Sequence, residues 1–218
     1  MEKEYENGSV DDICLKVFGA LTASVTHEIK NTLSIINENA GLLEDLCAMA
    51  EGEAGIPAEH VGAASKTVMK QVDRSNTILK NLNRFAHSGD KVPAQANMED
   101  TLTLMAALTG RFAAMKKITV TTSCQSGVEI QTNLLVLESL LVLTLSRIYD
   151  ACPEDSVLML RGEVDDMRRL RVRFMLEGET ALACAPPGLR EHTLAAEIGV
   201  LFAEEKGEVL IDLTACAK

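Results

Sequence analysis

The stretch HEIKNTLSIINENAGLLEDL, from His27 to Leu46, has the periodicity of a long amphipathic helix. At about 100° per residue, six apolar side chains in and just before it fall within a band of roughly 80°. These residues are Val25, Ile29, Leu33, Ile36, Ala40 and Leu43. His27 lies opposite this band, and three polar residues fall within about 40° of it: Asn31, Ser34 and Glu38. The sequence therefore predicts a helix with an exposed polar column that begins with a histidine.

This helix is the first half of a predicted helical hairpin. Helical periodicity runs from about Val10 to Ala50, and glycines and a proline interrupt it in EGEAGIPAEH, residues 51–60. A second helical pattern runs from about Ala58 to His87, and SGDKVPAQ, residues 88–95, is typical of a linker. Two helices joined by a short loop form an αα-hairpin, which usually needs a partner to cover its apolar face. Residues 1–88 are therefore predicted as a first domain.

The periodicity changes after the linker. Helices are predicted at about 97–115, 134–151 and 191–203. Strands are predicted at 117–124, 128–132, 156–164, 168–176 and 207–215, with a turn at Asp165-Asp166. Helices and mostly hairpin-connected strands favour one helix layer on a mixed sheet. The predicted fold class is α+β, with an α/β sandwich at residues 94–218.

Composition excludes several functions. With a formal net charge of −11 and only 3% aromatic residues, the chain lacks the features of nucleic-acid binding. The six cysteines are scattered singly, without the spacing of a zinc or thioredoxin-type site. The start is polar and acidic, and the most apolar run, Leu134 to Leu145, is too short to span a membrane. We therefore expect a cytoplasmic protein that binds no nucleic acid or membrane and has no sensor segment before the hairpin.

The polar column has a simple structural interpretation and a chemical one. Most polar stripes are solvated helix faces. A neutral imidazole is, however, a nucleophile near neutral pH, and a neighbouring carboxylate such as Glu28 can fix its tautomer or accept its proton. The amide of Asn31, one turn from His27, both donates and accepts hydrogen bonds and could orient a water or an acyl phosphate. An exposed histidine is accessible to another protein's active site, which points to phosphoryl transfer between macromolecules.

The segment THEIKNTLSIINENAGLL resembles the phosphoacceptor box of sensor histidine kinases, His-Glu/Asp-x-x-Asn/Thr on the first helix of a dimerisation hairpin. His27, Glu28 and Asn31 match this motif residue by residue. The resemblance extends over nearly the whole chain. It implies that His27 is phosphorylated, that Glu28 assists, and that Asn31 helps to dephosphorylate a response regulator. It also implies a homodimeric four-helix bundle, with a receiver domain docking on Ser34 and Glu38.

In that family the following domain is an ATP-binding α/β sandwich of GHKL type, and three of its elements are replaced here. Val142 and Ser146, with Arg147 next, stand where the family has asparagines for magnesium. Met175 or a neighbour replaces the adenine-binding aspartate, and Gly178 alone remains of that turn's glycines. Residues 191–194 replace the glycines of the lid. We therefore expect a domain that keeps the fold but binds no nucleotide, metal or other cofactor.

These features favour a phosphorelay histidine phosphotransferase that exchanges phosphoryl groups with receiver aspartates through His27. Three alternatives remain open: a response-regulator phosphatase that uses Asn31, a docking module without chemistry, and an active kinase with a divergent nucleotide site.

A cluster of arginines on one predicted strand has two interpretations. Its members are Arg168, Arg169, Arg171 and Arg173. It could dock an acidic protein, but such a run is more often a solvated sheet edge.

Overall fold

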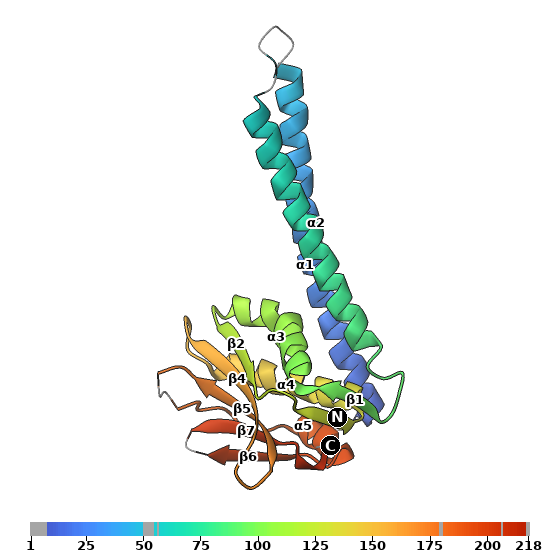
Figure 1. Ribbon diagram of the computed structural model, residues 1–218, viewed down its shortest axis with the longest axis vertical. Helices are drawn as coiled ribbons and strands as arrows, with labels where there is room; N and C mark the ends of the chain where they lie inside the picture. The colour runs from blue at the N-terminus through green and yellow to red at the C-terminus, as the bar shows by residue number, and fades with distance from the viewer. Residues whose placement is uncertain (1–7, 50–54, 56, 179–180, 206, 217–218) are drawn as a thin grey trace, which may run out of the picture. The chain divides into compact units, whose positions relative to one another are not determined.

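The computed structural model describes residues 8–49, 55, 57–178, 181–205 and 207–216 (Figure 1). The helices are α1 (Val10–Met49), α2 (Ala58–Ala86), α3 (Met98–Met115), α4 (Leu134–Ala151), α5 (Leu189–Glu197) and the 3₁₀ turn η1 (Thr214–Cys216). The strands are β1 (Ala94–Asn97), β2 (Thr119–Cys124), β3 (Glu129–Thr132), β4 (Val157–Val164), β5 (Leu170–Leu176), β6 (Leu201–Glu205) and β7 (Glu208–Asp212). The chain divides into a hairpin unit, residues 22–83, and an α/β unit, residues 1–21 with 84–218.

The hairpin unit consists of most of α1 and α2. The side chains of Val25, Thr32 and Ala64 are buried in it. The hydroxyls of Thr32 on α1 and Ser75 on α2 lie 2.7 Å apart and share a hydrogen bond. This pair satisfies two polar groups between the helices, which would otherwise be costly to bury.

The α/β unit is built on a five-stranded sheet with the order β2-β4-β5-β7-β6. β2 is parallel to β4, and all the other neighbours are antiparallel. β1 and β3 form a separate antiparallel pair. The helices α3, α4 and α5 lie on one side of the five-stranded sheet (Figure 1). Alternate strand residues supply the apolar face beneath them, because successive side chains point to opposite faces: Leu158, Leu160, Val172, Phe174 and Ile211.

The first three turns of α1 belong to the α/β unit. α1 begins with a reciprocal cap, in which the amide of Asp12 donates to Ser9 Oγ and the amide of Ser9 donates to Asp12 Oδ2. Val17 and Leu21 are buried, and the rings of Phe18 and Phe85 stack with centroids 6.3 Å apart. The division between the two compact units therefore falls at residues 21/22 and 83/84.

The predicted fold class, a helical hairpin followed by an α/β sandwich, is confirmed, and two elements need correction. The helix predicted at 191–203 ends at Glu197, and residues 201–205 form β6, which pairs with β7. Gly199 lies between them with a φ of +68°, a conformation that glycine adopts without strain. The end of the predicted linker belongs to β1, whose residues 94–97 pair with β3. The parts of the predicted domains at residues 1–7, 50–54, 56 and 217–218 lie outside the described residues.

Arg171 and Arg173 of the arginine cluster lie on the sheet face opposite the helices, and Arg168 and Arg169 precede β5, where Arg169 pairs with Asp165. Arg171 is buried and lies within 4 Å of Asp165, Glu205 and Asp212. Arg173 pairs with Glu163, Glu205 and Glu208. Three of the four arginines, Arg169, Arg171 and Arg173, are therefore paired with acidic side chains and are not free to attract an acidic partner.

Candidate functional site

The predicted polar column is exposed along α1. His27, Asn31, Ser34 and Glu38 are all exposed. None of these four side chains forms a hydrogen bond or ion pair with another residue that the structure describes. The imidazole of His27 and the amide of Asn31 are therefore accessible to an incoming macromolecule, and neither supports the hairpin.

Glu28, the acid next to His27, faces the second helix of the hairpin. Its side chain is 18% exposed, and its Oε2 atom lies 3.4 Å from the Nη2 atom of Arg74 on α2. At about 100° per residue, Arg74 falls on the same side of the hairpin as His27. The hairpin thus places near the histidine a carboxylate that can hold a proton, and a guanidinium that pairs with that carboxylate.

The apolar band predicted on α1 is covered only in part. Val25 is buried, but Leu33 is 50% exposed. On α2, Val72 and Leu79 are also exposed, and the helical count places them on the same side of the hairpin as Leu33, opposite His27. The band is therefore divided, because α1 presents one part of it to α2 and leaves another part exposed to solvent. The exposed part is continued by Val61 and Met69.

The region that the resemblance assigns to a nucleotide contains a buried ion pair. The Nε atom of Arg147 on α4 lies 2.8 Å from Oε1 of Glu191 on α5, and both side chains are largely buried. The Nη1 atom of Arg147 also donates to Cys184 Sγ and to the carbonyl of Ala185. Glu191 accepts hydrogen bonds from Thr144 Oγ1 and from the amide of Gly188. These contacts tie the segment before α5 to α4.

This arrangement does not fit magnesium. A hard cation prefers oxygen ligands and would here meet the guanidinium of Arg147, whose carboxylate partner is already engaged. Among the described residues, no group of three His, Cys, Asp or Glu side chains is placed to hold a metal. Val142 and Ser146 lie on a different face of α4, where they line a separate cavity. Met175 is half-buried within β5, and Gly178 follows that strand with a φ of +86°.

No protein-family model and no curated protein matches this sequence. Solved structures do match. The histidine kinase AdeS of Acinetobacter baumannii is 12% identical with a TM-score of 0.41, over 85% of this chain and 95% of that one. The histidine kinase ThkA in complex with the response regulator protein TrrA is 13% identical with a TM-score of 0.43, over 92% and 63%. A bacterial phosphotransferase is 19% identical with a TM-score of 0.42, over 92% and 95%.

The chain is similar to histidine kinases and to a phosphotransferase. No helix in the described part of the chain is long and apolar enough to cross a membrane.

Sequence reasoning missed two parts of the site. Arg74 is one of several charged residues on α2, and only the pairing of the two helices brings it to Glu28. Glu191 lies 44 residues from Arg147, so no local pattern indicates their contact. The sequence does indicate that Arg147, on the apolar helix α4, needs an acidic partner, because a buried charge is costly without one. It does not indicate which residue that partner is.

Proposed function

We propose that this protein is a two-component signalling protein that transfers phosphoryl groups between His27 and the receiver aspartate of a response regulator. The observation that carries the proposal is the exposed imidazole of His27, with Glu28 beside it and Asn31 one turn away. A free imidazole on an open helix face suits a phosphate donor that brings its own active site.

The chemistry requires little from the hairpin beyond position. The lone pair of the imidazole attacks the phosphorus of an aspartyl phosphate, an N–P bond forms, and the O–P bond breaks to release the carboxylate. The ring then loses the proton on its other nitrogen, and the carboxylate of Glu28 can attract that proton. Arg74 weakens the attraction of Glu28 for that proton, because it holds the carboxylate in an ion pair of 3.4 Å. Ser34 and Glu38, further along the column, would contact the receiver.

We further propose that the α/β unit binds no ATP. The Arg147–Glu191 pair supports this, because it puts a positive charge where a metal would need oxygen ligands. The phosphoryl group would then come from a phosphorylated receiver and not from a nucleotide.

The exposed apolar face supports a homodimer. Leu33, Val72 and Leu79 leave apolar surface in water on the side of the hairpin away from His27. Pairing two such faces would give a four-helix bundle and leave both histidine columns open.

A response-regulator phosphatase is the second candidate. The side chain of Asn31 is exposed and bonds to none of the described residues, so its amide is free to orient a water against an aspartyl phosphate. In that case phosphate would leave the receiver without becoming attached to His27.

The decisive experiment mixes the protein with a radiolabelled phosphoreceiver from the same organism and follows the label over time. We expect label on the wild-type protein and none on His27→Ala. The matched control is His60→Ala, an exposed histidine of the same hairpin, which should behave as wild type. Release of free phosphate that depends on Asn31 but not on His27 would replace the transferase with the phosphatase. Labelling by ATP alone would refute the loss of nucleotide binding.

A further inference from the structure

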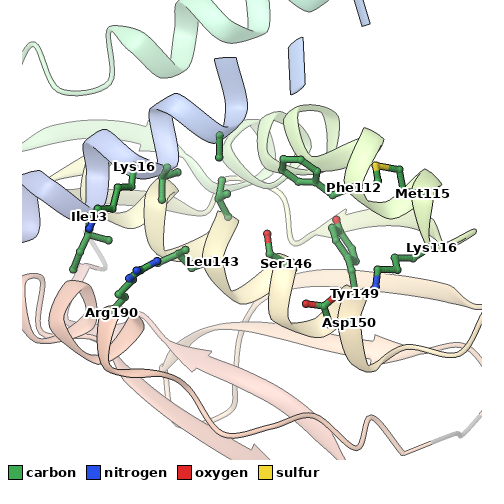
Figure 2. A pocket seen from close by; sticks show the side chains of 13 residues that line it. Ile13, Lys16, Phe112, Met115, Lys116, Leu143, Ser146, Tyr149, Asp150 and Arg190 are labelled. Atoms are coloured by element: carbon green, nitrogen blue, oxygen red, sulfur yellow. Dashed lines mark ion pairs between the residues drawn. The ribbon is translucent and has the colours of Figure 1, made fainter. Parts of the chain in front are cut away.

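A cavity of about 340 Å³ lies within the α/β unit, away from the Arg147–Glu191 pair. Its walls come from the start of α1, the end of α3 and one face of α4, with Arg190 of α5 at one side (Figure 2). Most of its surface is apolar, with Val17, Phe112 and Val142 among the lining residues. The volume is at the lower end of the range for small-molecule sites.

Two polar groups of the cavity already have partners. The hydroxyl of Tyr149 shares a hydrogen bond of 2.9 Å with Thr109 Oγ1, and burial raises the pKa of Tyr149 to about 12, so this phenol stays neutral. Asp150 pairs with Lys116 at 2.9 Å at the other end. Neither group is free to fix the head of a charged ligand.

Two cations at one end of the cavity have no such partner. Figure 2 shows Lys16, from α1, and Arg190, from α5, extending from opposite walls. Within the described part of the chain, neither forms an ion pair or hydrogen bond, although the charge of Lys16 acts on Asp12 one turn earlier. Both residues are exposed, so they place two positive charges at the solvent side of an apolar cavity, an arrangement that favours an anionic ligand head.

We propose that this cavity binds a single-chain amphiphilic carboxylate, with its head between Lys16 and Arg190 and its chain against Val17, Phe112 and Val142. One negative group and one apolar chain match the two ends of the cavity, and its small volume excludes a diacyl lipid. The ligand would connect α1 to α3, α4 and α5. The proposal does not depend on phosphoryl transfer, so His27→Ala should bind the ligand as wild type does.

The test is titration calorimetry of the full chain with decanoate below its micellar concentration. We expect saturable binding of one molecule per chain. Each CH₂ group removed from the ligand should weaken binding roughly fourfold, because burial of one such group contributes about 0.8 kcal/mol. Decyltrimethylammonium, which has the same chain and the opposite charge, should not compete. Phosphatidylglycerol vesicles should not compete either, and binding to vesicles in place of decanoate would assign the surface to a membrane and overturn the proposal.

Variants locate the ligand. Ser146→Phe and Ala20→Phe, at two incompletely buried lining positions, should fill the cavity and abolish binding. Lys16→Gln and Arg190→Gln should each weaken binding by up to about fivefold, with Lys66→Gln on α2 as the control. Unchanged circular dichroism checks that each variant folds. Decanoate binding that none of these variants changes, or no saturable binding at all, would overturn the proposal. Binding of a receiver domain that Ser146→Phe abolishes, together with no binding of decanoate, would also overturn the proposal.

Discussion

Arg147 Nε and Glu191 Oε1 lie 2.8 Å apart, joining α4 to the first turn of α5. The pair is almost enclosed, and the Nη2 atom of Arg147 has no hydrogen-bond partner among the described residues. A buried pair of this kind contributes less than its Coulomb energy, because both charges lose their hydration, but removing one partner leaves the other charge uncompensated.

We therefore expect Arg147→Ala to lower the free energy of unfolding by about 3 kcal/mol. Urea denaturation measures the change. Arg161→Ala is the control, since its pair with Glu163 is exposed and should contribute about 1 kcal/mol or less. The double variant Arg147→Met/Glu191→Leu should lose less than Arg147→Ala. An equal loss in both would mean that the Arg147–Glu191 ion pair itself provides the stability.

The buried carboxyl of Glu138 should make the stability of the folded protein depend on pH. It is buried on α4, and burial raises its pKa from 4.5 to about 7 despite the Ser88 hydroxyl and the charge of Arg84. Between these values the folded state holds a proton that the unfolded state has released, so stability falls as pH rises from 4.5 through 7. The loss above pH 7 is roughly 3 kcal/mol.

Glu138→Gln should remove this loss. Its stability should exceed that of the wild type by up to roughly 3 kcal/mol at pH 8 and match it at pH 4. Denaturation at a series of pH values measures the difference, with the exposed Glu44→Gln as the control. A difference that does not change with pH would show that the Glu138 carboxyl does not titrate in this range.

Gly162 on β4 is required by close packing. An added Cβ would lie 2.8 Å from Cys124 Sγ and 3.0 Å from Met98 Cγ, so these two side chains would have to shift in a packed core. Gly162→Ala should destabilise the protein by about 1–3 kcal/mol. Gly41→Ala is the matched control on α1, where nothing lies within 4 Å of the new carbon. It should stabilise the helix by up to about 1 kcal/mol, and thermal unfolding of both variants compares the two effects.

Glu28 and Arg74 should have opposite effects on phosphoryl transfer, if transfer is the function. Glu28→Gln removes the carboxylate that attracts the proton of His27 and should slow transfer about tenfold or more. Arg74→Gln frees that carboxylate and should leave the rate unchanged or raise it, with little effect on stability because Arg74 is exposed. Rapid-quench transfer assays give both rates, and equal slowing by the two variants would contradict this division of roles.

Leu33 and Leu42 test the proposed dimer. They lie on the same helix with almost equal exposure, 50% and 49%, but nine residues apart and thus on opposite sides of α1. Leu33→Glu places a charge in the apolar face and should convert a dimer into monomers in sedimentation velocity. Leu42→Glu should remain dimeric. Monomeric wild-type protein at micromolar concentration would rule out the four-helix bundle.

The helices of this chain could be predicted where apolar residues recur at a regular helical spacing. The three-to-four-residue spacing of apolar side chains places α1, α2 and α4 within a residue or two of their observed ends, because helix periodicity is a local property. The strand β6 could not be predicted in this way. Its residues come shortly after the end of α5. They form a strand because β7 provides hydrogen-bonding partners along one edge.

The site divides in the same way. The sequence alone determined that His27, Asn31, Ser34 and Glu38 share one helix face, since their spacing and the helix geometry require it. Only the tertiary structure decided that Glu28 meets Arg74 and that Arg147 meets Glu191. Contacts between residues so far apart in the chain depend on how helices pack, and packing is set by the whole core and by no local pattern.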